Sequence, residues 1–112
     1  MRYWEIICQV TLDSLRLPMA ILSFSSKSLE RLFEDDDRTG VAPASVQKLG
    51  DILAALDNAR TLSDLRVFPG WRLHPLSGNL NGLWSLTVTR NRRVVFRFFR
   101  GNAYDVDLVD YH

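Results

Sequence analysis

The two histidines of the chain are the residues best suited to proton transfer. His74 lies in a run of alternating residues, and His112 is the last residue, directly after Asp110 and Tyr111. Imidazole can donate or accept a proton near neutral pH, because the unperturbed pKa of histidine is about 6.5. Two imidazoles, a carboxyl and a phenol form a set that could exchange protons with a substrate. A lone histidine is more often structural, so the prediction depends on the whole set lying together.

Arginines accompany this set. Residues 71–112 contain six arginines against three aspartates, whereas residues 1–70 contain eight basic residues against ten acidic ones. A guanidinium group can donate two hydrogen bonds to one phosphate, and a basic region attracts polyanions. We therefore expect Arg72, Arg93 and Arg97 to bind phosphate or RNA. The alternative, which stays open at this point, is that these charges only solvate the outer face of a sheet.

RNA cleavage without a metal ion needs this combination of groups. A general base takes the proton of the ribose 2′-hydroxyl, a general acid protonates the leaving 5′-oxygen, and cations stabilise the charge on the phosphate. No Cys, His and acidic residues have the spacing of a metal site, so we expect no metal and no other cofactor. We expect His112 at the 2′-hydroxyl and His74 near the leaving oxygen.

Length and composition indicate a single small domain. The chain has 112 residues, of which 46% are hydrophobic, and this is enough for one core. Cys8 is the only cysteine, so no internal disulfide can form, which suits a cytoplasmic protein. We find no apolar run long enough to span a membrane. The net charge of +1 predicts no partner by itself.

Two helices are predicted in the first half of the chain. Residues 21–24 read as a short strand, and the serines at 25 and 26 can cap the helix that follows. The acidic run 34–37 and Gly40 end this helix, and we expect the run to be a solvated face rather than a metal site. Pro43 begins a second helix that extends to about residue 59, with apolar residues at helical spacing. The two helices should form a hairpin with one shared apolar side.

The second half predicts four strands, at residues 71–76, 83–88, 93–99 and 103–110. Turns at 77–82, 90–91 and 101–102 join them into an antiparallel meander. The predicted fold class is α+β, with two N-terminal helices packed on one face of a mostly antiparallel, curved sheet of four to five strands. In the last strand we expect a buried set of Tyr104, Val106 and Leu108. For Trp71 and Phe99 we favour packing over stacking on bases. Alternation predicts that the open face carries Arg72, His74, Arg93, Arg97, Asp105, Asp107 and Tyr111.

Residues 1–18 have no obvious place in this plan. They end in Pro18, and the economical succession of elements begins only at residue 21. Either they add a strand or a helix, or translation begins at Met19. We favour the second explanation, in which residues 1–18 are an extension and residues 19–112 form the domain.

Four segments resemble the HigB branch of the RelE-like toxins. They are WRLHPLSG at 71–78, GLWSL at 82–86, NRRVVF at 91–96 and DYH at 110–112. The resemblance covers about residues 20–112 and implies the RelE-like microbial RNase fold. It implies a catalytic cluster and a phosphate-binding Arg93. Ser77 stands where family members often have lysine, which puts the rate and the codon preference in doubt. The implied catalytic residues are His74, Asp110, Tyr111 and His112.

The resemblance also implies a cytoplasmic toxin of a type II toxin–antitoxin system. Such toxins enter the decoding site of the small ribosomal subunit, cut mRNA there and are inhibited by a helix-turn-helix, HigA-like antitoxin. Two alternatives share the fold. One is a ParE-like toxin that inhibits gyrase without nuclease chemistry, and the other is an inactive module that retains only affinity for RNA or antitoxin. The histidines favour the nuclease, because pure binding needs no acid–base set.

Overall fold

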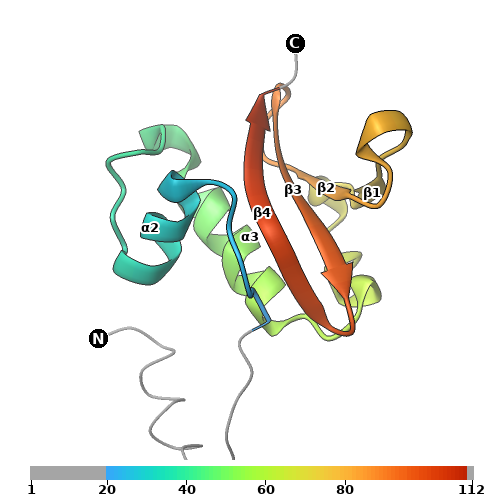
Figure 1. Cartoon of the computed structure of the whole chain (residues 1–112). Helices are drawn as coiled ribbons and strands as arrows, with labels where there is room; N and C mark the ends of the chain where they lie inside the picture. Colours follow the sequence, from blue (N-terminus) through green and yellow to red (C-terminus); the bar gives the residue numbers. More distant parts are fainter. Residues whose placement is uncertain (1–19, 111–112) are drawn as a thin grey trace, which may run out of the picture.

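The computed structural model describes residues 20–110 (Figure 1). The expectations for residues 1–18, Tyr111 and His112 therefore lie outside the described residues. Within this described range two helices precede four strands, which confirms the predicted α+β class and the four-stranded alternative. Between them lie short 3₁₀ turns. The helices and strands are α2 (Lys27–Asp35), α3 (Val46–Asn58), β1 (His74–Pro75), β2 (Trp84–Thr87), β3 (Arg92–Phe99) and β4 (Asn102–Asp110).

Helix α2 begins where the capping serine predicts, whereas the second helix becomes α-helical only at Val46, three residues after the predicted start. The Ser26 hydroxyl accepts a hydrogen bond from the Leu29 backbone N–H at 3.2 Å, and so it caps α2. Helix α2 ends at Asp36, whose backbone is left-handed with φ of 55°. A 3₁₀ turn that begins at Pro43 leads into α3. The spacing of apolar residues then leaves one buried stripe on α3, namely Leu49, Ile52, Leu53 and Leu56.

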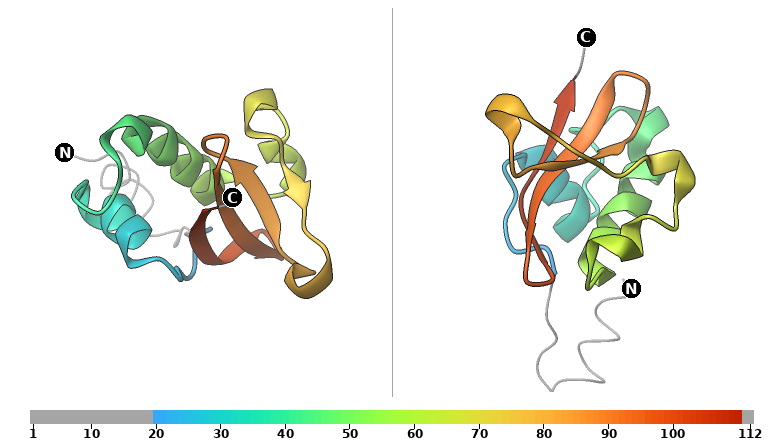
Figure 2. Two further views of the ribbon diagram at one scale, coloured as in Figure 1. Left: turned by 90° about the horizontal axis from the view of Figure 1, so that it is seen from above. Right: turned by 90° about the vertical axis from the view of Figure 1, so that its right-hand side faces the viewer.

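The sheet is an antiparallel meander in the order β1-β2-β3-β4. Residues 21–24 do not form the predicted strand but make two isolated parallel bridges to β4, through Ile21 and Phe24. Between these bridges the Ser23 hydroxyl accepts the backbone N–H of Asp105 at 2.8 Å, so a side chain replaces a bond of the ladder. Figure 2 shows α3 against one side of the sheet. One core cluster joins buried residues of α2, α3, β2, β3 and β4, and Phe96 is its largest fully buried side chain.

The first strand is shorter than predicted. Only His74 and Pro75 pair with β2, whereas Trp71 belongs to a 3₁₀ turn that begins at Pro69. Arg72 follows this turn with a positive φ of 50°, which interrupts the extended backbone. The prediction of one continuous strand over residues 71–76 was therefore wrong, and alternation does not give the position of the Arg72 side chain.

A β-bulge in β4 changes which residues are buried. Val95 pairs with Asp107 and Arg97 pairs with Tyr104, so two residues of β4 lie opposite Phe96 alone. The bulge residue Asp105 has a φ of 53°. Beyond it the alternation shifts by one residue, so Ala103 is fully buried and Tyr104 is only half-buried, across from Arg97. The expectation that Tyr104 belongs to the buried set was wrong for this reason.

Candidate active site

His74 lies on the sheet face that turns away from the core. Its register partner is Ser85, whose own partner is Val95, which in turn pairs with Asp107. These four residues form one row across the sheet, on the side opposite to the buried Leu86 and Phe96. The His74 side chain is exposed, so its imidazole is accessible to a large substrate. This position confirms the sequence-based placement of His74 on the open face.

Arg93 occupies the middle of the same face. Its register partners are Thr87 on β2 and Val109 on β4, one row beyond the row of His74. The Arg93 Nη1 donates a hydrogen bond to the Thr87 hydroxyl at 3.1 Å, and the arginine is half-buried. A guanidinium held in this way loses less conformational entropy on binding than a fully mobile one. Arg93 is therefore placed to bind an anion that lies across β2 and β3.

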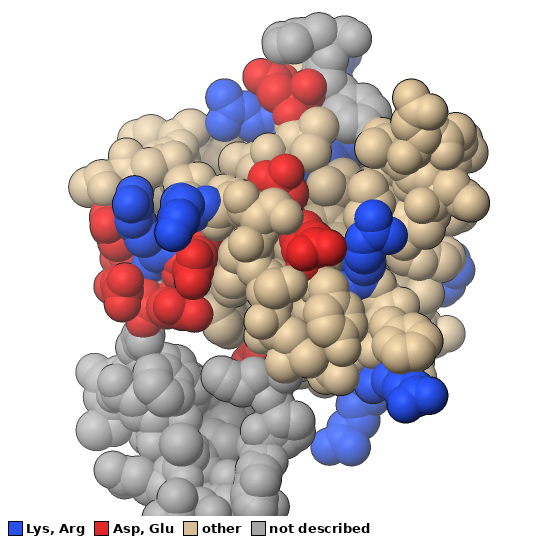
Figure 3. All heavy atoms as spheres, viewed as in Figure 1, with Lys and Arg blue, Asp and Glu red and all other residues tan. Residues whose placement is uncertain are grey.

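Arg97 lies on this face too, but an aspartate partly balances its charge. The Arg97 Nε is 3.3 Å from an Asp105 carboxylate oxygen, and each side chain is 54% exposed. Exposed pairs of this kind contribute about 0–1 kcal/mol to stability, so a phosphate could compete for the guanidinium. Figure 3, which views the side away from α3, shows acidic and basic side chains together over β4 and β3.

Asp110 stands apart from His74. It pairs with Arg92, so by alternation it shares a sheet face with Leu108 and lies on the opposite face from Asp107. Strands lie about 4.8 Å apart, so the three intervals from β1 to β4 place His74 and this strand roughly 14 Å apart. Direct contact between the Asp110 and His74 side chains is therefore excluded in this arrangement. Asp110 also lies on the opposite alternation from Arg93, which pairs with Val109.

The hydroxyl of Ser85 is an unusual group on this face. Ser85 is 1% exposed, and its Oγ has no hydrogen-bond partner within residues 20–110. Buried hydroxyl groups are normally paired, because an unpaired one loses its bonds to water. Sequence reasoning missed this residue, since nothing in the alternating pattern distinguishes a buried serine from an exposed one.

The aromatic residues near His74 are arranged as a layer. Trp71 packs against the core, as we favoured, and the Phe68 ring stacks on it with centroids 4.0 Å apart and planes inclined by 16°. Phe99 is exposed instead of packed, and the Arg100 guanidinium lies 5.1 Å from its ring centroid. Phe68, which precedes the first strand in the chain, is exposed as well, and sequence reasoning did not single it out.

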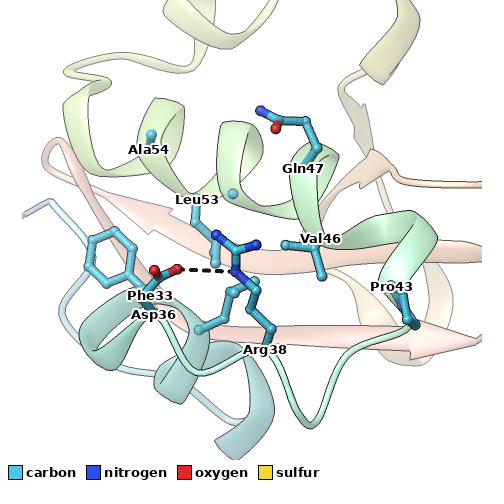
Figure 4. Close-up of a pocket in the computed structure, with 10 residues that line it drawn as sticks. Phe33, Asp36, Arg38, Pro43, Val46, Gln47, Leu53 and Ala54 are labelled. Atoms are coloured by element: carbon cyan, nitrogen blue, oxygen red, sulfur yellow. Dashed lines mark ion pairs between the residues drawn. The ribbon is translucent and has the colours of Figure 1, made fainter. Parts of the chain in front are cut away.

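A cavity lies between α2 and α3, away from the sheet face of His74. Its volume is about 440 Å³, and Figure 4 shows Phe33, Val46 and Leu53 along it with the Asp36–Arg38 ion pair at 3.6 Å. It includes none of the candidate catalytic residues. Within residues 20–110, no three histidine, cysteine or acidic side chains are grouped closely enough to hold a metal ion. The groups suited to chemistry therefore lie on the open sheet face.

Asp57 is a half-buried acidic residue of α3 that contacts the first described residues. Burial raises the pKa of its carboxyl, and hydrogen bonds from the backbone N–H groups of Ile21 and Ala20 act in the opposite direction. The carboxylate accepts the Ile21 N–H at 3.4 Å. Asp57 therefore ties residues 20–21 to α3 and has no place in the open-face site.

Comparison with known proteins agrees with this geometry. Residues 22–112 match a family model described as RelE-like toxin of type II toxin-antitoxin system HigB. The chain belongs to this family. The resemblance seen in the sequence is thus confirmed, and because type II systems pair a toxin with a protein antitoxin, this toxin has a cognate antitoxin.

Two curated relatives support the assignment. The chain is 40% identical over 92 residues to a protein of Proteus vulgaris named Endoribonuclease HigB, covering 82% of this chain and 99% of that protein. It is also 40% identical over 88 residues to Toxin HigB-1 of Vibrio cholerae serotype O1, covering 78% and 93%. Within residues 20–110, we find no helix with the length and apolar character needed to cross a membrane.

Proposed function

We propose that this toxin is an endoribonuclease that cuts mRNA on the ribosome without a metal ion. The observation that carries the proposal is the common face of His74 and Arg93, which presents an exposed imidazole and an anchored guanidinium to the same side. An enzyme that cleaves RNA needs a proton-transfer group and a cation at the phosphate. The name of the Proteus relative, an endoribonuclease, supports the same activity.

The reaction assigns one role to each group. His112 takes the proton of the 2′-hydroxyl, the 2′-oxygen attacks the phosphorus, and His74 protonates the leaving 5′-oxygen, so that a cyclic phosphate and a free 5′-hydroxyl result. Asp110 and Tyr111 orient the His112 imidazole and the ribose. Arg93 binds the phosphate as its charge grows, and Arg72 and Arg97 bind flanking phosphates.

The small ribosomal subunit would position the RNA strand for cleavage by the toxin. His74 and Arg93 line neither of the two described pockets, so the toxin alone does not enclose the scissile phosphate. Positioning of reactants contributes much of the rate of many enzymes, and the small ribosomal subunit would hold the mRNA in its decoding site against this face. We place this activity in the cytoplasm and expect a helix-turn-helix, HigA-like antitoxin to restrain it.

Mapping of mRNA 5′ ends after brief induction tests the proposal. The intact chain should generate new 5′ ends inside translated codons, and His74→Ala should abolish them at equal expression. Lys48→Ala, at a partly exposed position on α3 remote from the sheet face of His74, serves as the matched control and should cut normally. Growth inhibition without new 5′ ends, together with inhibited gyrase, would overturn the proposal in favour of a ParE-like toxin.

A further inference from the structure

A second pocket lies just before His74 in the chain. It has a volume of about 150 Å³ and lies outside the row of His74, Ser85, Val95 and Asp107. Arg72 is only two residues from His74, so their Cα atoms are at most about 7 Å apart. Any group bound in this pocket would therefore be a close neighbour of the imidazole. The lining residues are Arg66, Phe68, Pro69, Arg72 and Leu73.

The aromatic wall of this pocket is supported from behind. Trp71 packs against the hydrophobic core, and Phe68 lies nearly flat on Trp71. Phe68 nevertheless remains 38% exposed, so its ring is both held in place and accessible. Aromatic rings of this kind are surfaces on which single-stranded RNA bases stack, because every base has a flat face.

The two charged residues that line the pocket are both arginines. Arg66 and Arg72 are exposed, and neither forms an ion pair with any residue between 20 and 110. No acidic residue lines the pocket. Arg72 also has a left-handed backbone, which glycine adopts at lower cost than arginine. Free guanidinium groups beside an exposed ring are suited to a ligand with both a phosphate and a base.

We propose that Arg66, Phe68 and Arg72 bind a nucleotide of the RNA next to the scissile one. The base stacks on Phe68, and the two arginines hold the adjoining phosphates. The position of this nucleotide rests on the proposed function, in which His74 acts at the scissile phosphate. The exposed ring, the two arginines without an ion pair in residues 20–110 and the absence of an acidic lining residue favour RNA over a protein segment.

Binding of a non-cleavable probe tests the proposal separately from cleavage. The probe is a tetranucleotide with 2′-O-methyl riboses, titrated into the full chain while the indole signal of Trp71 is followed by NMR. Phe68→Leu keeps an apolar cover on Trp71 but removes the stacking surface. We expect this change to weaken binding on the order of tenfold, the usual contribution of one base–aromatic stack. Arg31→Ala, an exposed arginine on α2, is the control and should bind like the intact chain.

Salt dependence distinguishes binding of a phosphate from a structural role. For single strands the plot of log K against log salt becomes less steep by about 0.7 for each phosphate that the protein no longer neutralises. We expect this shallower slope for Arg66→Ala and for Arg72→Gly, and Arg72→Gly should also keep the melting temperature because it relieves the left-handed backbone. A purely structural role of Arg72 would lower the melting temperature and leave the slope unchanged.

The outcomes separate this proposal from the proposed function. His74→Ala should bind the probe normally and fail to cut. If Phe68→Leu binds the probe as tightly as the intact chain while His74→Ala still abolishes cleavage, the pocket is not a nucleotide site although the toxin is a nuclease. Absence of probe binding by the intact chain, or loss of antitoxin binding alone in the Phe68 and arginine variants, would likewise overturn the proposal, and the latter result would identify a protein interface.

Discussion

Replacing Ser85 by alanine should stabilise this protein. The Ser85 side chain is 1% exposed and its hydroxyl has no hydrogen-bond partner within residues 20–110. Burying an unpaired hydroxyl costs about 1–3 kcal/mol, because its bonds to water are lost and not replaced. Alanine removes that cost and leaves a void of a single oxygen atom, which forfeits a few weak van der Waals interactions. We therefore expect a net gain of about 1 kcal/mol.

Urea and thermal unfolding would measure this gain. The urea midpoint should rise with an unchanged slope, since the surface exposed on unfolding stays the same. The melting temperature should rise by about 4–8 °C for each 1 kcal/mol in a domain of this size. Ser63→Ala, at an exposed position, is the control and should change stability by less than about 0.5 kcal/mol. A decrease of about 1 kcal/mol or more in Ser85→Ala would show that the hydroxyl has a partner, and the reasoning from burial would be wrong.

Four further outcomes are expected. Deleting His112 should slow cleavage about a hundredfold or more, and His74→Ala should slow it by a similar factor. The double variant should be slowed by less than the product of the two factors, because the two groups act in one step. A variant without His112 that cuts at the normal rate would remove His112 from the mechanism. Cleavage of an isolated decoding-site RNA should survive EDTA, and cleavage on ribosomes should survive replacement of magnesium by calcium; restoration by zinc or manganese alone would refute the metal-free reaction. Burial raises the pKa of the Asp57 carboxyl in the folded state, so the folded state loses stability as pH rises from the ordinary pKa of aspartate through this raised value. Asp57→Asn should therefore have a higher melting temperature than the intact chain at pH 7, and the difference should shrink towards pH 3. Equal melting temperatures of the two proteins at both pH values would contradict this. A chain that starts at Met19 should unfold at the same urea midpoint as the full chain, and a markedly lower midpoint would place residues 1–18 in the core.

Local signals in the sequence were enough to predict the helices and the general order of the strands. Ser26 caps α2 through a bond to a residue three positions later, and Pro43 precedes α3 in the turn where its missing N–H costs nothing. Both features depend on neighbours in the chain. The HigB resemblance was likewise visible in short segments, such as the one around His74, which the family model then confirmed.

Other features depend on residues far apart in sequence, and alternation alone could not predict them. The bulge at Asp105 depends on how β4 pairs with β3, and it moves Tyr104 to the face of Arg97. The register of the same pair separates Asp110 from the row of His74.

The sequence by itself therefore determined the presence of the two helices, the succession of strands and the face on which His74 lies, since these follow from periodicity and from capping between near neighbours. Only the tertiary structure decided that Phe68 lies flat on Trp71 beside two exposed arginines. It also decided that Ser85 is buried without a partner in the described chain. The physical reason is that burial and stacking depend on which strands and loops pack together, and short-range periodicity carries no record of that packing.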